Sequence, residues 1–190
     1  MIDWTGLTDG ELAALSIAGR QAAFAEIMRR NRQPVFRLAR AFLGDSDEAL
    51  DLTQETFVAA HQALSRYDGD RPMRAWLSAI ALNKCRDHAR KRAVRRFLSF
   101  AMPIDSHAES MADDRAAIDD AAADRQELDQ VTRAISTLPM NLKEALVLRT
   151  IEGLSQAETA EVLSISEKAV ETRLYRARAR LLEKLGRAKG

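Results

Sequence analysis

The chain has 190 residues, of which 46% are hydrophobic and 30% charged, and this composition supports a buried core and excludes wholesale disorder. This length suggests one domain or two small ones, and the eight glycines, four prolines and few aromatic residues favour an all-α fold. The single cysteine, Cys85, excludes an intramolecular disulfide and a Cys-rich zinc site. The net charge is +1, no run approaches about 18 apolar residues, and the acidic start MIDWTGLTDGELAAL lacks signal-peptide features, so we expect a cytoplasmic protein without a membrane span.

The first helical segment ends before residue 44. Phe24, Ile27 and Met28 lie three and four residues apart, which is the spacing of one helix face. Pro34 is compatible either with a new helix that begins there or with a kink in one helix. The sequence GDSD at residues 44–47 predicts a glycine C-cap followed by the N-cap of the next helix.

The next predicted helix, roughly residues 47–65, has two different faces. One face shares an apolar spacing and is predicted to be buried: Leu50, Thr53, Phe57, Ala60 and Leu64. The other carries Asp51, Gln54 and Glu55, which are neighbours because helical residues three and four apart meet. This polar patch suits a protein partner with a basic groove, and a merely solvated face is the alternative.

A metal site is a competing interpretation of that patch. Glu48, Asp51 and Glu55 share a face, and His61 follows. Di-metal carboxylate bundles, however, need Glu-x-x-His pairs, and none is present here. We therefore expect no metal and no other cofactor.

Residues 66–72 form a predicted loop in which Pro72 is placed to open a helix. The helix that follows begins with a stripe predicted to be buried: Met73, Trp76, Leu77, Ile80 and Ala81. Its later part, residues 84–97, carries seven Lys or Arg against one Asp, which predicts a helix anchored in a core and directed towards an anion. Asn83 can contact base edges, whereas the basic side chains would mostly contact phosphates. Trp76, Cys85 and His88 are each expected to be structural.

Charge alternates in blocks from residue 84 onwards, beginning with the basic residues 84–97. Residues 101–127 carry eight acidic residues against two arginines, and residues 168–190 carry eight basic residues against two acidic ones. Two basic segments, residues 84–97 and 168–190, are thus separated by an acidic, Ala/Asp-rich stretch. This pattern indicates polyanion-binding surfaces joined by a solvated linker. Any single block could instead be a solvated helix face.

The segment after residue 153 has the pattern of a helix–turn–helix. Ser155 and Glu158 form a capping box, and the helix of about eight residues that it opens is expected to bury Ala157, Ala160 and Leu163. Ser164 occupies the turn, where a positive φ is expected, and the longer basic helix that follows would lie in the DNA major groove. The alternative is an ordinary helical hairpin.

Four motifs occur in one order along the chain: DLTQETF at 51–57, AWL at 75–77 with Asn83 and Asp87 after it, Leu138-Pro139, and the stretch 154–181. Together they resemble an extracytoplasmic-function (ECF, group 4) sigma factor of the sigma-70 family of bacterial RNA polymerase, over about residues 20–97 and 127–186. The resemblance implies two small helical domains, sigma-2 at 20–97 and sigma-4 at 127–190. It places a flexible acidic linker at 98–126 and an N-terminal extension without a clear role at 1–19.

The resemblance also implies partners and site residues. Asp51, Gln54 and Glu55 would bind the β′ clamp of core polymerase, with a further contact to the β flap. The minus-10 element would be recognised and melted by a set drawn from the loop and the following helix: Arg71, Arg74, Trp76, Asn83, Lys84, Arg86, Asp87, Arg90 and Arg92. The minus-35 element would be recognised by Ser166, Lys168, Glu171, Thr172, Arg173 and Arg176, although Glu171 stands where many relatives carry Lys or Arg. An anti-sigma factor would hold the chain inactive, and the free chain would be a monomer without catalytic residues or membrane insertion.

Two other functions are alternatives to this one. A stand-alone, dimeric helix–turn–helix regulator would explain the C-terminal segment but would leave the Asp51 face and the helix after Pro72 without a role. A metal-dependent nuclease would need a nucleophile–base pair, a phosphate loop or a metal-ligand set, and the sequence contains none of these.

Overall fold

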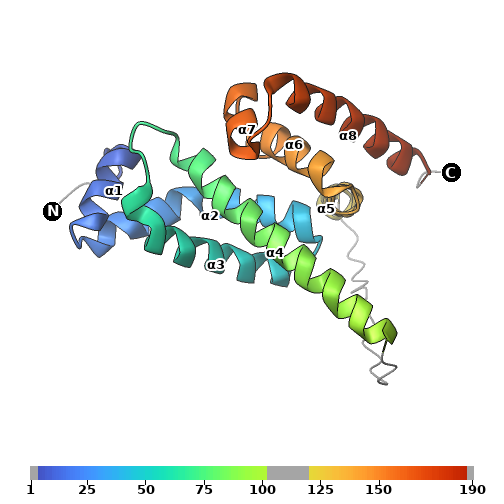
Figure 1. Cartoon of the computed structure of the whole chain (residues 1–190), viewed down its shortest axis with the longest axis horizontal. Helices are drawn as coiled ribbons and strands as arrows, with labels where there is room; N and C mark the ends of the chain where they lie inside the picture. Colours follow the sequence, from blue (N-terminus) through green and yellow to red (C-terminus); the bar gives the residue numbers. More distant parts are fainter. Residues whose placement is uncertain (1–3, 102–119, 188–190) are drawn as a thin grey trace.

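The computed structural model describes residues 4–101 and 120–187, and the regular secondary structure of those residues is entirely helical (Figure 1). The helices are α1 (Asp9–Ile17), α2 (Gln21–Leu43), α3 (Ser46–Ala63), the 3₁₀ helix η1 (Leu64–Arg66), α4 (Met73–Ala101), α5 (Asp120–Ser136), α6 (Met140–Thr150), α7 (Gln156–Leu163) and α8 (Glu167–Arg187). The all-α prediction is confirmed. No helix among these residues is long and apolar enough to cross a membrane. Residues 102–119, the middle of the expected acidic linker, lie outside the described residues.

Helix α2 is one continuous helix that contains Pro34, so no new helix begins at the proline. It ends at Gly44, whose φ of 78° lies in the left-handed region that favours glycine, and the Gly44 N–H donates to the carbonyl oxygen of Arg40 (2.8 Å). Asp45 then caps α3 by accepting from the N–H of Glu48 (2.8 Å). Both caps predicted from residues 44–47 are confirmed.

The N-terminal segment packs on α2 through α1. Thr8 and Glu11 form a capping box at the start of α1, and Leu12 and Ala13 are buried. Arg30 of α2 donates to backbone carbonyl oxygens of the preceding segment, at 3.0 Å for Trp4 and Thr5 and 2.8 Å for Leu7. These bonds hold the segment before α1 against α2.

The buried face of α3 differs in one position from the prediction. Leu50 is 37% exposed, and Leu52 is buried instead. The reason is that α3 packs against both α2 and α4, so its buried stripe is broad and Leu50 falls at its edge. There Leu50 and Met28 of α2 line an open groove. The hydroxyls of Thr53 and Thr56, also buried, donate to carbonyl oxygens one turn earlier (2.7 Å each).

Helices α7 and α8 form the predicted helix–turn–helix. The capping box at Ser155 is present, and Ser164 has a φ of 54°, as expected for the turn. One prediction for α7 is wrong: Ala157 is exposed and Thr159 is fully buried in its place, beside Ala160 and Leu163. With Ser155 as N-cap, the register of α7 turns Thr159 and Ala160 inward together.

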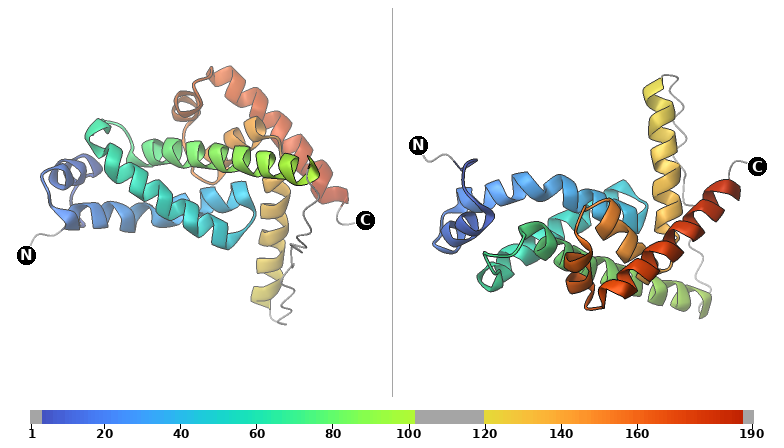
Figure 2. Two further views of the ribbon diagram at one scale, coloured as in Figure 1. Left: turned by 60° about the horizontal axis from the view of Figure 1, so that its bottom comes forward. Right: turned by 90° about the horizontal axis from the view of Figure 1, so that it is seen from above.

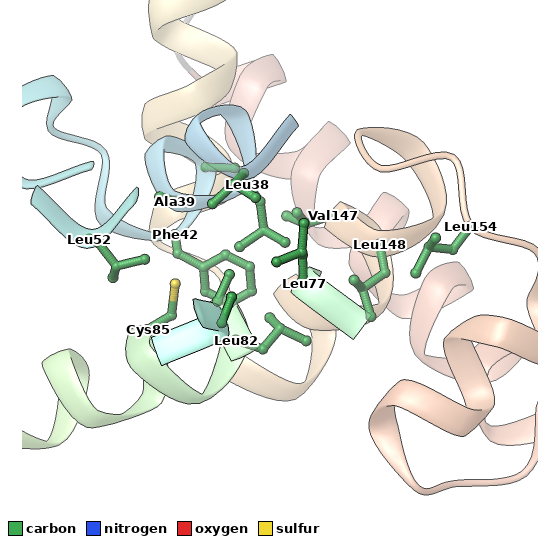
Figure 3. Close-up of a cluster of buried hydrophobic side chains, with 14 of the residues drawn as sticks. Leu38, Ala39, Phe42, Leu52, Leu77, Leu82, Cys85, Val147, Leu148 and Leu154 are labelled. Atoms are coloured by element: carbon green, nitrogen blue, oxygen red, sulfur yellow. The ribbon is translucent and has the colours of Figure 1, made fainter. Parts of the chain in front are cut away.

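The two units share one hydrophobic core. Helix α2 contacts α5 and α6, and α4 contacts α7, so α6 and α7 lie against the N-terminal bundle (Figures 1 and 2). In Figure 3, Leu77 of α4 lies beside Val147 and Leu148 of α6, next to Leu38 and Phe42 of α2. This packing determines which side chains of the two units face each other.

Candidate functional site

The outer face of α3 carries an exposed polar patch. Asp51, Gln54 and Glu55 are exposed and line a shallow pocket of about 440 Å³ together with Val58 and Lys84. Val58 is 60% exposed, and Lys84 Nζ lies 3.6 Å from Glu55 Oε2. An acidic patch with an exposed apolar side chain beside it suits a protein partner that supplies basic and apolar groups.

The metal interpretation of this helix gains nothing from the structure. Glu48 Oε2 lies 3.9 Å from Nε2 of His88, and His61 packs edge-on against Phe24 with a centroid distance of 4.7 Å. Within residues 4–101 and 120–187, no group of three or more His, Cys, Asp or Glu side chains could hold a metal ion.

The second half of α4 extends from the bundle with its basic side chains in solvent (Figure 1). Arg90 and Arg92 are exposed, and Arg90 donates to Asp87 (3.1 Å). Asn83 is also exposed and accepts from Arg86 (3.1 Å). A projecting, cationic helix face of this kind can contact a phosphate backbone.

The loop before α4 and the first turn of α4 each contribute one ring to an aromatic pair. Trp76 is half-buried against Tyr67 with a ring-centroid distance of 5.2 Å, and the Tyr67 hydroxyl donates to the carbonyl oxygen of Arg71 (2.5 Å). Burial, reinforced by Asp9 and loop carboxylates, raises the pKa of Tyr67 to about 12. Sequence reasoning did not single out Tyr67, although an aromatic residue inside an otherwise polar loop was a usable signal.

The other arginines predicted for the minus-10 element face the C-terminal unit. Arg74 contacts Glu152, Arg86 contacts Glu144, and Arg71 contacts Glu161. Sequence reasoning missed these partners, since they lie far along the chain and no local pattern connects them.

The exposed face of α8 brings the predicted minus-35 residues together. Ser166 caps the helix by accepting from the N–H of Ala169 (3.2 Å). Beyond it, exposed and half-buried polar side chains follow at helical spacing: Lys168, Glu171, Thr172, Arg173 and Arg176. Tyr175 is 76% exposed between them and was not predicted. The Gln156 side chain donates to the carbonyl oxygen of Glu167 (3.1 Å), which ties α7 to the start of α8.

Comparison with known proteins accounts for both units. Residues 27–95 match the family described as Sigma-70 region 2, and residues 128–181 match Sigma-70, region 4. The chain is 31% identical over 179 residues to the ECF RNA polymerase sigma factor SigM of Mycobacterium tuberculosis, across 94% of this chain and 85% of that protein. The chain belongs to the ECF sigma factors of the sigma-70 family. It is therefore an RNA polymerase sigma factor. The match to region 2 favours this function over that of a stand-alone helix–turn–helix regulator.

This sigma factor is similar to other members in sequence and in structure. It is 42% identical over 175 residues to the RNA polymerase sigma factor CnrH of Cupriavidus metallidurans, across 91% of this chain and 92% of CnrH. The structure of CnrH in complex with the cytosolic domain of CnrY matches with a TM-score of 0.68 at 36% identity, over 94% of this chain and 97% of CnrH. RpoE of Bartonella quintana, in complex with the anti-sigma factor NepR, shares the fold with a TM-score of 0.67 at 24% identity.

Lys143 of region 4 anchors this region to region 2 of the sigma factor. Its ammonium donates to the carbonyl oxygen of Phe42 (Nζ–O 3.1 Å) near the end of α2, and to that of Ser136 at the end of α5. Carbonyls at a helix C-terminus lack intrahelical partners and attract a cation. Lys143 is nevertheless buried, and burial lowers its pKa from the ordinary 10.5 to about 8.

The stability of this sigma factor is expected to rise between about pH 8 and pH 9. An unfolded lysine keeps its proton up to about pH 10.5, whereas folded Lys143 loses it near pH 8. The unfolded chain therefore binds more protons in this range, and the free energy of unfolding increases with pH. Above about pH 9 the Cys85 thiol, whose pKa burial raises to about 12, acts in the opposite direction.

Urea unfolding at about pH 7, 8 and 9 measures this dependence. The Lys143→Met variant keeps much of the side-chain volume but has no proton to lose, so it should lack the increase. Identical pH profiles for the two proteins would contradict the assignment to Lys143.

Proposed function

We propose that this sigma factor binds core RNA polymerase through the α3 face of Asp51, Gln54 and Glu55 and directs it to promoters with two separate DNA-binding surfaces. The loop 66–72 and α4 bind and melt the minus-10 element, and α8 binds the minus-35 duplex. The observation that carries the proposal is the combination, in one chain, of an exposed acidic face in region 2 and a capped helix–turn–helix in region 4.

The two DNA surfaces can each be weak. Once both are attached to one polymerase, binding at the first raises the effective concentration at the second, so overall affinity exceeds that of either part. A net charge of +1 is then sufficient, because the basic residues are concentrated on α4 and α8. At the minus-10 element, capture of a flipped base offsets the few kcal/mol that unstacking costs.

Regulation and location follow from the same proposal. A protein partner that covers the DNA- and polymerase-binding surfaces would hold the sigma factor inactive, and the structure of CnrH with the cytosolic domain of CnrY supports a partner of this kind. The chain would act in the cytoplasm, where polymerase and DNA are found, as a monomer and without catalytic chemistry of its own.

Co-elution with bacterial core RNA polymerase tests the proposal. We expect the wild-type chain to co-elute stoichiometrically, and the Asp51→Ala/Glu55→Arg variant to lose co-elution because a basic partner surface then meets a new positive charge. All three proposed contact residues are exposed, so the thermal unfolding midpoint should stay close to that of the wild type.

The matched control is Glu171→Arg, which reverses an exposed carboxylate on α8 and should leave co-elution intact. A wild-type chain that fails to co-elute, elutes as a dimer and binds duplex DNA tightly by itself would refute the proposal.

A further inference from the structure

The first turn of α1 lies against the loop that we assign to the minus-10 element (Figure 1). Helix α1 contacts η1, which leads into this loop, as well as α2. At the closest point two glycine backbones meet, and a Cβ atom on Gly10 would lie 2.9 Å from the carbonyl oxygen of Gly69 and 3.3 Å from its Cα. These separations are shorter than van der Waals contact, so a side chain at position 10 would force the loop or α1 to move.

This close approach accounts for glycine at position 10. Gly10 is the second residue of α1, after the N-cap Thr8, and glycine forms a helix less readily than alanine. Its φ lies outside the left-handed region, so the backbone conformation does not require glycine either. A Cβ atom on Gly6, four residues earlier, would meet nothing within 4 Å. The absence of a side chain at position 10 therefore serves the contact with the loop.

Helix α1 is held in place on α2, so it can serve as a fixed support. Arg30 of α2 donates to the Asp9 carboxylate (3.3 Å), in addition to its bonds to the segment before α1. The same guanidinium donates to Glu26 of α2 (2.8 Å), which is 7% exposed. The capping box of Thr8 and Glu11 closes the first turn of α1. That turn is thus fixed relative to α2.

The loop on the other side of the contact is a tight turn centred on Gly69. The Asp70 N–H donates to Oδ1 of Asp68 (3.1 Å), and the Arg71 N–H donates to the Asp68 carbonyl oxygen (3.0 Å). The Tyr67 hydroxyl donates to the carbonyl oxygen of Arg71 (2.5 Å) and so joins the two ends of the turn. Because of these bonds, a displacement at Gly69 moves the Tyr67 ring and Arg71 with it.

We propose that Gly10 is a positioning residue for promoter recognition, because the first turn of α1 sets the place of the loop through Gly69. The rings of Tyr67 and Trp76 then stay where a base of the minus-10 strand would stack on them. This inference rests on the proposed role of loop 66–72 at the minus-10 element. It gives the N-terminal extension, to which the sequence assigned no clear role, a function in reading the promoter.

Gly10→Ala in the full chain tests whether the contact fixes the loop. Alanine favours a helix at this position, so α1 should form and the thermal unfolding midpoint should stay close to that of the wild type. The amides of Asp70 and Arg71 should exchange with deuterium about tenfold faster, because the displaced turn opens more often. The matched control is Gly6→Ala, which adds the same methyl group in open space and should change neither loop exchange nor DNA recognition.

The effect on recognition is measured with holoenzyme and a single strand of about 12 nucleotides, selected from random DNA with the wild-type protein. Fluorescence anisotropy gives the affinity for this strand and for a random-sequence strand of the same length. Gly10→Ala should lower the ratio of the two affinities by about tenfold, since a misplaced site loses discrimination. Loss of folded protein would lower both affinities equally and leave the ratio unchanged. If Gly10→Ala leaves either the exchange rate or this ratio at its wild-type value, the proposal is overturned.

Arg30→Met provides a second test that adds no bulk at the contact. It removes the donors that hold Asp9 and the segment before α1, while Glu26 keeps its two hydrogen bonds from Arg29 (2.7 Å each). Helix α1 should loosen, with faster loop exchange and a lower affinity ratio, as for Gly10→Ala. Arg29→Met is the matched control, since it removes the same charge from the neighbouring residue of α2, which is 65% exposed. Equal effects of the two arginine variants would show that charge, rather than the support from α1, determines recognition.

The role of the loop itself is measured separately, with Trp76→Ala in the holoenzyme. A wild-type affinity ratio in this variant would refute base stacking on the aromatic pair and with it the proposed function of the loop. A reduced ratio, together with a wild-type ratio in both Gly10→Ala and Arg30→Met, would refute the positioning role alone.

Discussion

Replacing Lys168 and Arg176 by alanine is expected to lower transcription from a promoter of this sigma factor by about tenfold to a hundredfold. The two side chains are exposed on the outer face of α8, two turns apart, where the helix–turn–helix geometry places DNA. A lost contact to a base edge costs about 1–3 kcal/mol, and a lost phosphate contact weakens binding at all sequences. Co-elution with polymerase should be unchanged.

The measurement is run-off transcription from a promoter selected out of random DNA with the wild-type holoenzyme. Arg178→Ala/Arg180→Ala is the matched control, since it removes the same charge from the following turns of α8, and its effect should be several-fold smaller. Equal losses in the two variants would indicate general electrostatic attraction rather than a localised contact surface.

Leu148→Ala is expected to lower the free energy of unfolding by about 3–4 kcal/mol, through lost apolar contacts and the cavity that remains. Leu148 is fully buried in the core shared by the two regions, between the side chains of α4 and α6 (Figure 3). Because that core is continuous, both regions should unfold in one transition that shifts to lower urea concentration.

Leu182→Ala is the control for this change, because Leu182 is 72% exposed and the same truncation on the surface should cost less than about 0.5 kcal/mol. Two separate unfolding transitions, of which only one moves in Leu148→Ala, would show that the regions are energetically independent.

Features that depend on neighbouring residues were predictable from the sequence. The caps at Asp45, Ser155 and Ser166 and the left-handed Ser164 each follow from a few adjacent side chains and backbone donors, and the structure contains all four. The buried stripe of α3 was harder to predict from the sequence. Leu50 and Leu52 are equally apolar, and only the directions of approach of α2 and α4 determine which one is buried.

Contacts between distant segments were not predictable. Sequence reasoning treated Arg71, Arg74 and Arg86 as free for DNA, whereas the structure pairs them with carboxylates 90, 78 and 58 residues further along the chain. Those carboxylates also lie outside the acidic stretch 101–127, which composition alone distinguishes. Charge blocks indicate which kind of ligand a segment attracts, but docking of whole helices decides which ion pairs form.

The position of Cys85 limits the chemistry that can act on this sigma factor. The thiol is the only one in the chain, is 1% exposed and lies among Leu52, Phe42 and Leu82 (Figure 3). Oxidants and alkylating agents react with the exposed thiolate, and burial raises the pKa of this thiol to about 12. The thiol is therefore protected from peroxide and alkylating agents while the chain is folded, and its modification requires the surrounding core to open. The same inertness makes any cysteine introduced at the surface a unique attachment point for a fluorophore.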